Sequence, residues 1–67
     1  MTIRIIVNGE QHTVPENCTL TDLLQLLKVE GRLAIEVNGK IIPHSSQSDF
    51  ILSENDRVEI VHAIGGG

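Results

Sequence analysis

Aromatic side chains are almost absent from this chain of 67 residues, which has no Trp, no Tyr and one Phe, Phe50. The core must therefore be aliphatic, and the rings on which single-stranded nucleic acid stacks are missing. Basic residues are also few: five Lys and Arg stand against nine Asp and Glu, for a formal net charge of −4. Binding to nucleic acid or to an anionic membrane is not expected, whereas a partner with a basic surface fits this charge.

Cysteine occurs once, as Cys18, so an intrachain disulfide is excluded and a reducing, cytoplasmic setting is favoured. Cys18 is interpreted as a packing residue, because no partner for a catalytic dyad stands near it. The three histidines (His12, His44 and His62) match no compact zinc spacing, and no metal is expected. Long apolar runs and the layout of a signal peptide are missing, so no membrane segment or leader is predicted.

The length predicts one small domain without room for an enclosed cofactor pocket, and no bound cofactor is expected. Apolar alternation predicts strands at 3–7, 10–14, 33–37 and 58–64, with a shorter strand at 40–42. Asn8-Gly9 and Asn38-Gly39 are typical of tight type I′ turns. A leucine stripe at helical spacing starts at Leu20, after a capping pair, Thr19 and Asp22. Gly31 is expected to reverse the chain after this helix.

The order of these elements is strand, strand, helix, strand, strand, strand. It predicts an α+β fold of the β-grasp, ubiquitin-like type, in which a mixed sheet of four to five strands packs on one main helix. The first and last strands are expected to pair in parallel in the middle of the sheet. Residues 44–49 are interpreted as a polar connection, and residues 50–52 are expected to fold back on the core. The domain is expected to span 1–64, followed by a flexible glycine tail at 65–67.

Three glycines, Gly65, Gly66 and Gly67, follow the last predicted strand. Glycine has no Cβ, so the tail is slim and conformationally permissive. At roughly 3.3–3.6 Å per extended residue, residues 63–67 reach about 16–18 Å beyond the body. The pattern predicts a carrier whose reactive group is the carboxylate of Gly67, with Gly66 giving steric clearance and Gly65 acting as a hinge against the partner. A frayed, inert terminus is the alternative.

A docking face is expected on the side of the sheet away from the helix. Strand alternation and proximity to the tail give it the following members: Ile6, Ile42, Val61 and Ala63. Glu36 and Glu59 are expected to rim this apolar patch. Exposed patches of this kind often mark partner sites, although scattered exposed aliphatic residues are normal.

The stretch from Val58 to Gly67 resembles the C-terminus of the ThiS family, the sulfur carrier proteins of thiamin (thiazole) biosynthesis. The resemblance extends over 33–43, with its Val37-Asn38-Gly39 turn, and over the helix at 19–27. It departs at 44–47, where family members often carry an arginine and then a tryptophan.

The resemblance implies that a ThiF-type adenylyltransferase transfers AMP from ATP to Gly67. A persulfide donor then converts the terminus into a thiocarboxylate, which gives its sulfur to a ThiG-type thiazole synthase. The chain would be a protein co-substrate, not an enzyme, and the partner would consume the ATP. The alternatives are a MoaD-like molybdopterin-synthase subunit, a ubiquitin-like conjugating modifier and an interaction module with an inert tail. The sulfur acceptor that the loaded chain serves distinguishes a MoaD-like subunit from a ThiS-like carrier. Protein adducts on a denaturing gel would indicate a conjugating modifier.

Overall fold

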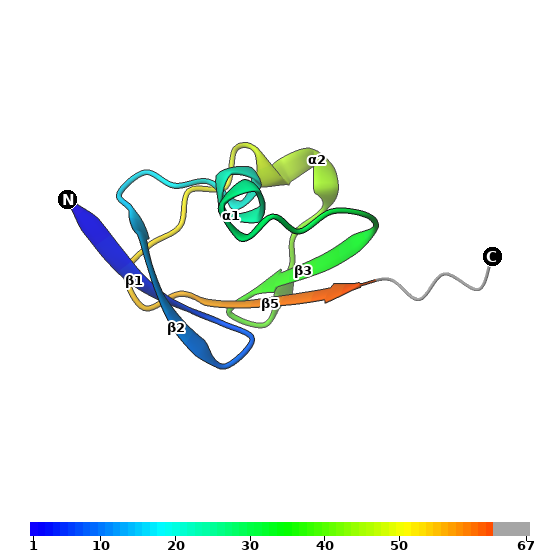
Figure 1. Ribbon diagram of the computed structural model, residues 1–67. Helices are drawn as coiled ribbons and strands as arrows, with labels where there is room; N and C mark the ends of the chain where they lie inside the picture. The colour runs from blue at the N-terminus through cyan, green and yellow to red at the C-terminus, as the bar shows by residue number, and fades with distance from the viewer. Residues whose placement is uncertain (63–67) are drawn as a thin grey trace.

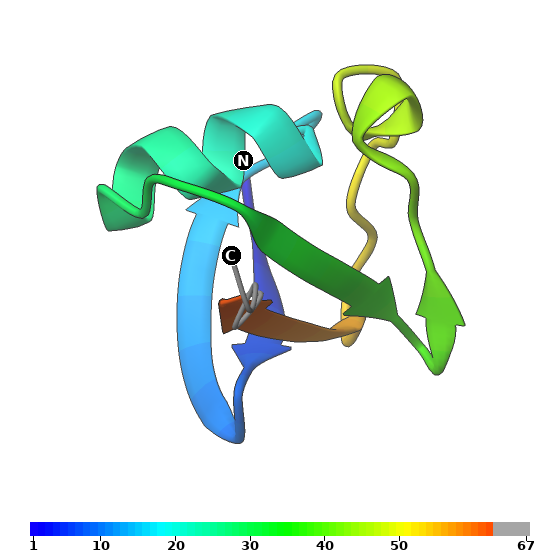
Figure 2. The same cartoon turned by 90° about the vertical axis from the view of Figure 1, so that its right-hand side faces the viewer.

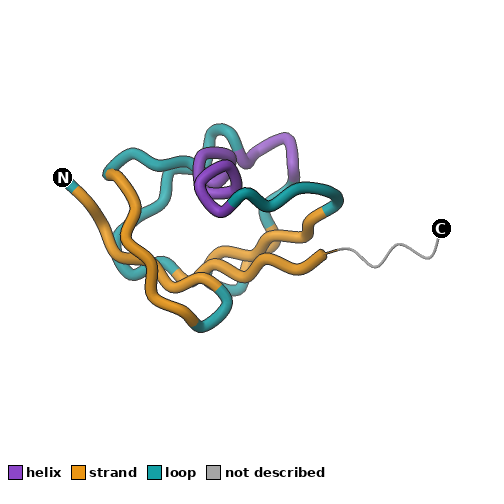
Figure 3. Tube along the Cα trace, viewed as in Figure 1, coloured by secondary structure: helices purple, strands orange, loops and turns teal. Residues whose placement is uncertain are grey.

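The computed structural model describes residues 1–62, and residues 63–67 lie outside the described part. The elements in chain order (Figure 1) are β1 Thr2–Val7, β2 Glu10–Pro15, α1 Leu20–Leu27, β3 Leu33–Val37, β4 Lys40–Ile41, α2 His44–Gln47 and β5 Arg57–His62. Figure 3 shows the strands in one layer and both helices on the same side of it. Within residues 1–62, neither helix is long and apolar enough to span a bilayer.

The strands form one mixed sheet with the order β2-β1-β5-β3-β4. β1 and β5 run parallel, and the other neighbours are antiparallel. Figure 2 shows β5 in the middle of this sheet, with α1 above it. The predicted β-grasp order and the central parallel pair of first and last strands are therefore confirmed. The last strand is described only to His62, so the predicted extension to residue 64 lies outside the described residues.

Both predicted hairpin turns are present, and each has its two central residues at positive φ. The values are 49° and 83° for Asn8 and Gly9, and 54° and 86° for Asn38 and Gly39. Two successive left-handed residues are what a type I′ turn requires, and its twist matches that of the flanking strands. These local signals set the registers of β1 with β2 and of β3 with β4.

The helix α1 begins at the predicted capping pair. The backbone N–H of Asp22 donates to Thr19 Oγ1 at 3.1 Å, and the backbone N–H of Thr19 donates to Asp22 Oδ2 at 3.2 Å. The helix ends at Leu27, as the leucine stripe predicted, and Lys28 at its C-cap adopts the left-handed conformation, with φ 56°. Gly31, at φ 100°, continues the reversal that Lys28 starts.

The core lies between α1 and the inner face of the sheet. Its buried members are aliphatic apart from Cys18: Ile5, Val7, Val14, Cys18, Leu20, Leu23, Ile35, Val37, Leu52, Val58 and Ile60. Phe50 and the remaining leucines of the predicted stripe pack at the margin of this core. Leu52 confirms that the segment 50–52 folds back, while Ile51 points outward and forms an isolated bridge with Thr19.

Residues 44–47, interpreted as part of a polar connection, form the short helix α2. Pro43, with φ −60° and extended ψ, stands at the N-cap without a side-chain hydrogen bond. Gln47 is only 3% exposed, and its Nε2 donates to the carbonyl of Ile42 at 3.4 Å. Gln47 can be buried because its side-chain amide is hydrogen-bonded to Ile42, the residue after β4.

Candidate functional site

The predicted reactive residues, Gly66 and Gly67, lie outside the described residues, as do Ala63 and Gly65. The structure instead defines the strand from which they follow. β5 is flanked by β1 on one side and β3 on the other, and its last residue, His62, lies opposite Leu33. The site is therefore built around the end of a central strand, where the pairing with β3 continues to His62.

Two asparagine side chains hold β5, one near each of its ends. The backbone N–H of Ile60 donates to Asn8 Oδ1 at 2.8 Å, and Asn8 Nδ2 donates to the carbonyl of Ile60 at 3.1 Å. At the start of the strand, the backbone N–H of Arg57 donates to Asn38 Oδ1 at 3.0 Å. Sequence reasoning treated both asparagines as turn residues only. Their recurrence in two Val-Asn-Gly motifs was the signal that could have revealed the second role.

The outer face of the sheet carries two of the residues predicted for docking. Val61 is 56% exposed, and Ile6 is half-buried between the inward-facing Ile5 and Val7. The prediction that Ile42 lies on the outer face is wrong. Ile42 packs against the core, and its N–H donates to the carbonyl of Ile35 at 2.8 Å. Ile41 takes its place on the outer face, opposite Glu36 and 71% exposed.

The two acidic residues of this face also lie differently from the prediction. Glu36 and Glu59 are directly opposite each other in the β3–β5 register. Ala34 pairs with Val61 further along the same two strands. The carboxylates therefore lie between the apolar residues rather than around them. Arg57 faces the same side and pairs with Ile6. We call the following residues the outer face: Ile6, Ala34, Glu36, Ile41, Arg57, Glu59 and Val61.

Like charges placed directly opposite each other across two strands destabilise a sheet. Neither carboxylate of the outer face forms an ion pair within residues 1–62, where the salt bridge present joins Arg4 and Glu54. Arg57 lies two residues before Glu59 on the same face and offsets part of this repulsion, and a cation from another molecule would offset more of it. The face thus combines exposed aliphatic groups with an acidic centre, which suits a partner surface of mixed basic and apolar character.

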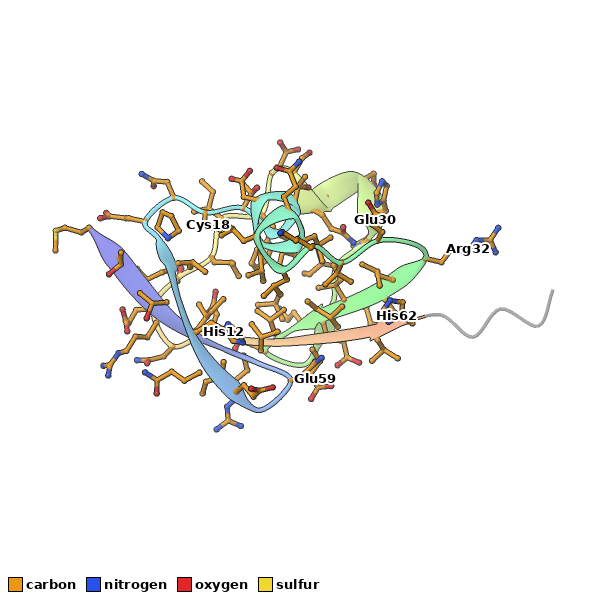
Figure 4. All side chains as sticks on the ribbon, in the orientation of Figure 1. His12, Cys18, Glu30, Arg32, Glu59 and His62 are labelled. Carbon is orange, nitrogen blue, oxygen red and sulfur yellow. The ribbon has the colours of Figure 1, made fainter. Side chains whose placement is uncertain are left out.

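Cys18 lies beside the start of α1, on the opposite side of the sheet from Glu59 (Figure 4). It is 4% exposed, and its Sγ donates to the carbonyl of Thr19 at 3.5 Å. Burial, reinforced by the negative charge of Asp22, raises the pKa of this thiol. The environment favours the unreactive thiol over the thiolate. Within residues 1–62, no three His, Cys, Asp or Glu side chains cluster as metal ligands.

The fold and the central strand leading to the glycines define a class, the small β-grasp proteins. The crystal structure of the thiamine biosynthesis protein (ThiS) from Geobacter metallireducens matches with a TM-score of 0.86 and 30% identity, covering 97% of this chain and 100% of that chain. The model of the ThiS family matches residues 2–67. The chain belongs to the ThiS family, which confirms the resemblance seen in the sequence.

Curated relatives fall into two groups. The protein named thiazole synthase of Paramagnetospirillum magneticum is 36% identical over 97% of this chain. The chain spans only 20% of the length of that relative. The uncharacterized protein ycf40 of Porphyra purpurea is 35% identical over 97% of this chain and 93% of its own length.

Proposed function

We propose that this protein is the sulfur carrier of thiamin thiazole biosynthesis, acting in the cytoplasm as a protein co-substrate. Its reactive group is the carboxylate of Gly67. A ThiF-type enzyme adenylates it, a persulfide donor supplies sulfur, and the resulting thiocarboxylate serves a ThiG-type thiazole synthase. The observation that carries the proposal is the ThiS-family match, which runs from residue 2 to residue 67 and so includes the three glycines.

The chemistry explains why an activating partner is needed. A free carboxylate is a poor electrophile, since oxide would have to leave. Transfer of AMP from ATP to Gly67 releases pyrophosphate and forms a mixed anhydride with a good leaving group. Attack by a persulfide expels AMP and leaves an acyl disulfide, which a thiol reduces to the thiocarboxylate. The partners supply positioning and charge stabilisation for these steps, and the carrier supplies the acyl group.

The outer face supports docking to the adenylating partner. Exposed Val61 lies two residues before the undescribed segment, so a protein that grips the tail is brought against this face. The opposed Glu36 and Glu59 give the face a negative centre. Basic groups on the partner, set among apolar ones, complement both features.

The curated relatives support a thiazole synthase as the sulfur acceptor. Proteins of that name from Paramagnetospirillum magneticum and Magnetococcus marinus each contain a segment similar to 97% of this chain. Joining a carrier to its acceptor raises their effective concentration, which favours linkage of proteins that act in succession.

Intact-mass spectrometry tests the proposal. A chain whose carboxyl end is Gly67 is incubated with ATP, a ThiF-type enzyme and a sulfur source. Exchange of one terminal oxygen for sulfur should add about 16 Da, as atomic masses require. A chain lacking Gly67, and a reaction without ATP, should show no such gain. An unchanged mass of the full chain in an assay that loads a known ThiS protein contradicts the proposal.

A second assay separates the acceptors. The loaded chain is offered to a thiazole synthase and, in parallel, to the large subunit of a molybdopterin synthase. Thiazole formation with the first is expected. Sulfur transfer only to the second, or covalent adducts with lysines of other proteins, contradicts the thiazole assignment.

A further inference from the structure

The strand β5 extends beyond the strand that flanks it on one side. β1 pairs with β5 only at Ile6 with Arg57 and at Val7 with Val58. One more backbone hydrogen bond follows, from Asn8 N–H to the carbonyl of Val58 at 2.9 Å. The chain then turns away at Asn8-Gly9, while β5 continues to His62. Beyond Val58, the strand therefore has β3 on one side and no strand of the described residues on the other.

The side chain of Asn8 occupies the place that β1 leaves. In a parallel pair, a residue of one strand uses both its N–H and its carbonyl to bond two residues of the adjacent strand. Asn8 makes both bonds to Ile60 with a single carboxamide, since Oδ1 accepts at 2.8 Å and Nδ2 donates at 3.1 Å. The amide group thus acts as a short substitute for a strand. Ile60 therefore has Asn8 on one side and its register partner Ile35 of β3 on the other, although β1 has turned away.

The second Val-Asn-Gly motif performs the corresponding task at the other end of β5. Asn38 Oδ1 accepts from the N–H of Arg57 at 3.0 Å, and Asn38 Nδ2 donates to Asp56 Oδ1 at 3.0 Å. Asn38 acts from the β3 side at the start of the strand, and Asn8 acts from the β1 side near its end. The two turns have the same geometry, which makes them a matched pair for experiment.

We propose that Asn8 is a positioning residue for sulfur loading. It keeps β5 in the sheet up to its end and so fixes the point from which the glycines reach the active site of the adenylating partner. Without this carboxamide, residues 60–62 are held by β3 alone and fray. Fraying adds residues 60–62 to the length of chain between the sheet and Gly67 and removes Val61 from the outer face, so both the effective concentration of the carboxylate and the docking surface are reduced. The inference rests on the proposed function.

The test compares Asn8→Gly with Asn38→Gly. Glycine suits both positive-φ turn positions, so each variant keeps its hairpin and loses the side-chain hydrogen bonds. For adenylation by a ThiF-type enzyme, Asn8→Gly should raise KM about fivefold and leave kcat unchanged, because the chemistry is performed by the partner. The KM of Asn38→Gly should stay within about twofold of the value for the unsubstituted chain, since Asn38 acts at the far end of the strand.

Amide hydrogen exchange gives a readout independent of activity. The Ile60 amide should lose about tenfold or more of its protection in Asn8→Gly and keep it in Asn38→Gly. Asn8→Asp, which retains the acceptor but not the donor, provides a second variant if Asn8→Gly does not fold. Unchanged Ile60 protection, equal KM values for the two glycine variants, or a loss confined to kcat overturns the inference. If the unsubstituted chain is not adenylated at all, the proposed function fails, whereas the exchange data still report whether Asn8 holds β5.

Discussion

The carboxylates of Glu36 and Glu59 lie opposite each other on the outer face, where like charges repel. Replacing Glu59 with Gln removes the repulsion, so the free energy of unfolding should rise by about 0.5 kcal/mol. The same substitution should weaken adenylation, because the partner loses an anionic contact. Urea denaturation and the KM of the ThiF-type enzyme measure the two effects.

The control for this substitution is Glu54→Gln. Glu54 accepts from Arg4 Nε at 3.3 Å on the exposed surface. Its removal should leave stability unchanged or lower it by up to about 1 kcal/mol, with no effect on KM. Stabilisation by both substitutions, or by neither, contradicts the specific repulsion between Glu36 and Glu59.

Val61 offers a sharper test of the outer face. Val61→Asp should leave the fold intact, because the side chain is 56% exposed, and should raise the KM for adenylation. Ile51→Asp is the matched control, since Ile51 is 55% exposed but lies beside Thr19, away from the outer face. Circular dichroism checks the fold of both variants. Equal KM values for the two would remove the docking role of the face.

The buried thiol of Cys18 predicts that the stability of the folded chain depends on pH. Because burial and Asp22 raise its pKa, the protonated form is favoured more in the folded than in the unfolded chain. This contribution to stability is complete below the ordinary thiol pKa and is lost as the pH rises through the raised value. Iodoacetamide should therefore modify the native chain much more slowly than the urea-unfolded chain at pH 8. Equal rates would show that Cys18 is accessible and ionised.

Among the elements, α1 depends on the capping pair at its start. Thr19→Ala removes the acceptor for the N–H of Asp22 and should lower the free energy of unfolding by about 1 kcal/mol. Thr21 is the second residue of the same helix. Thr21→Ala should be neutral or slightly stabilising, since alanine has the higher helix propensity. Urea denaturation of both variants gives the comparison, and a loss of equal size in both would argue against the cap.

Local signals predicted most elements correctly. The turns at Asn8-Gly9 and Asn38-Gly39 and the cap at Thr19 depend on residues within four positions of each other, so they can be read without the fold. The short helix α2 was missed because it has four residues and no side-chain cap. Ile42 was assigned to the wrong face because β4 contains only two residues, too few for alternation to indicate a face.

The hydrogen bonds of Asn8 show what sequence reasoning could not reach. They join residues 8 and 60, whose proximity depends on the parallel register of β1 and β5. No periodicity within either segment specifies that register. The role of the three glycines, in contrast, was predicted from sequence alone, and it stays a prediction because they lie outside the described residues.

The negative net charge of the entire chain predicts how its association with the adenylating partner depends on salt concentration. The formal net charge of −4 should accelerate association with a basic partner, and added salt screens this attraction. Raising NaCl from about 50 to 300 mM should therefore raise the KM for adenylation several-fold while kcat changes little. An increase of the same size with KCl excludes a specific effect of sodium. A KM that does not depend on ionic strength contradicts electrostatic recognition.

The central place of β5 has a consequence for biosynthesis. The ribosome makes this strand after every other element, yet the sheet cannot close without it, because β1 and β3 meet only through β5. A prematurely terminated copy that lacks β5 should thus remain unfolded and be open to proteolysis. Only a copy that includes β5 should become a stable domain.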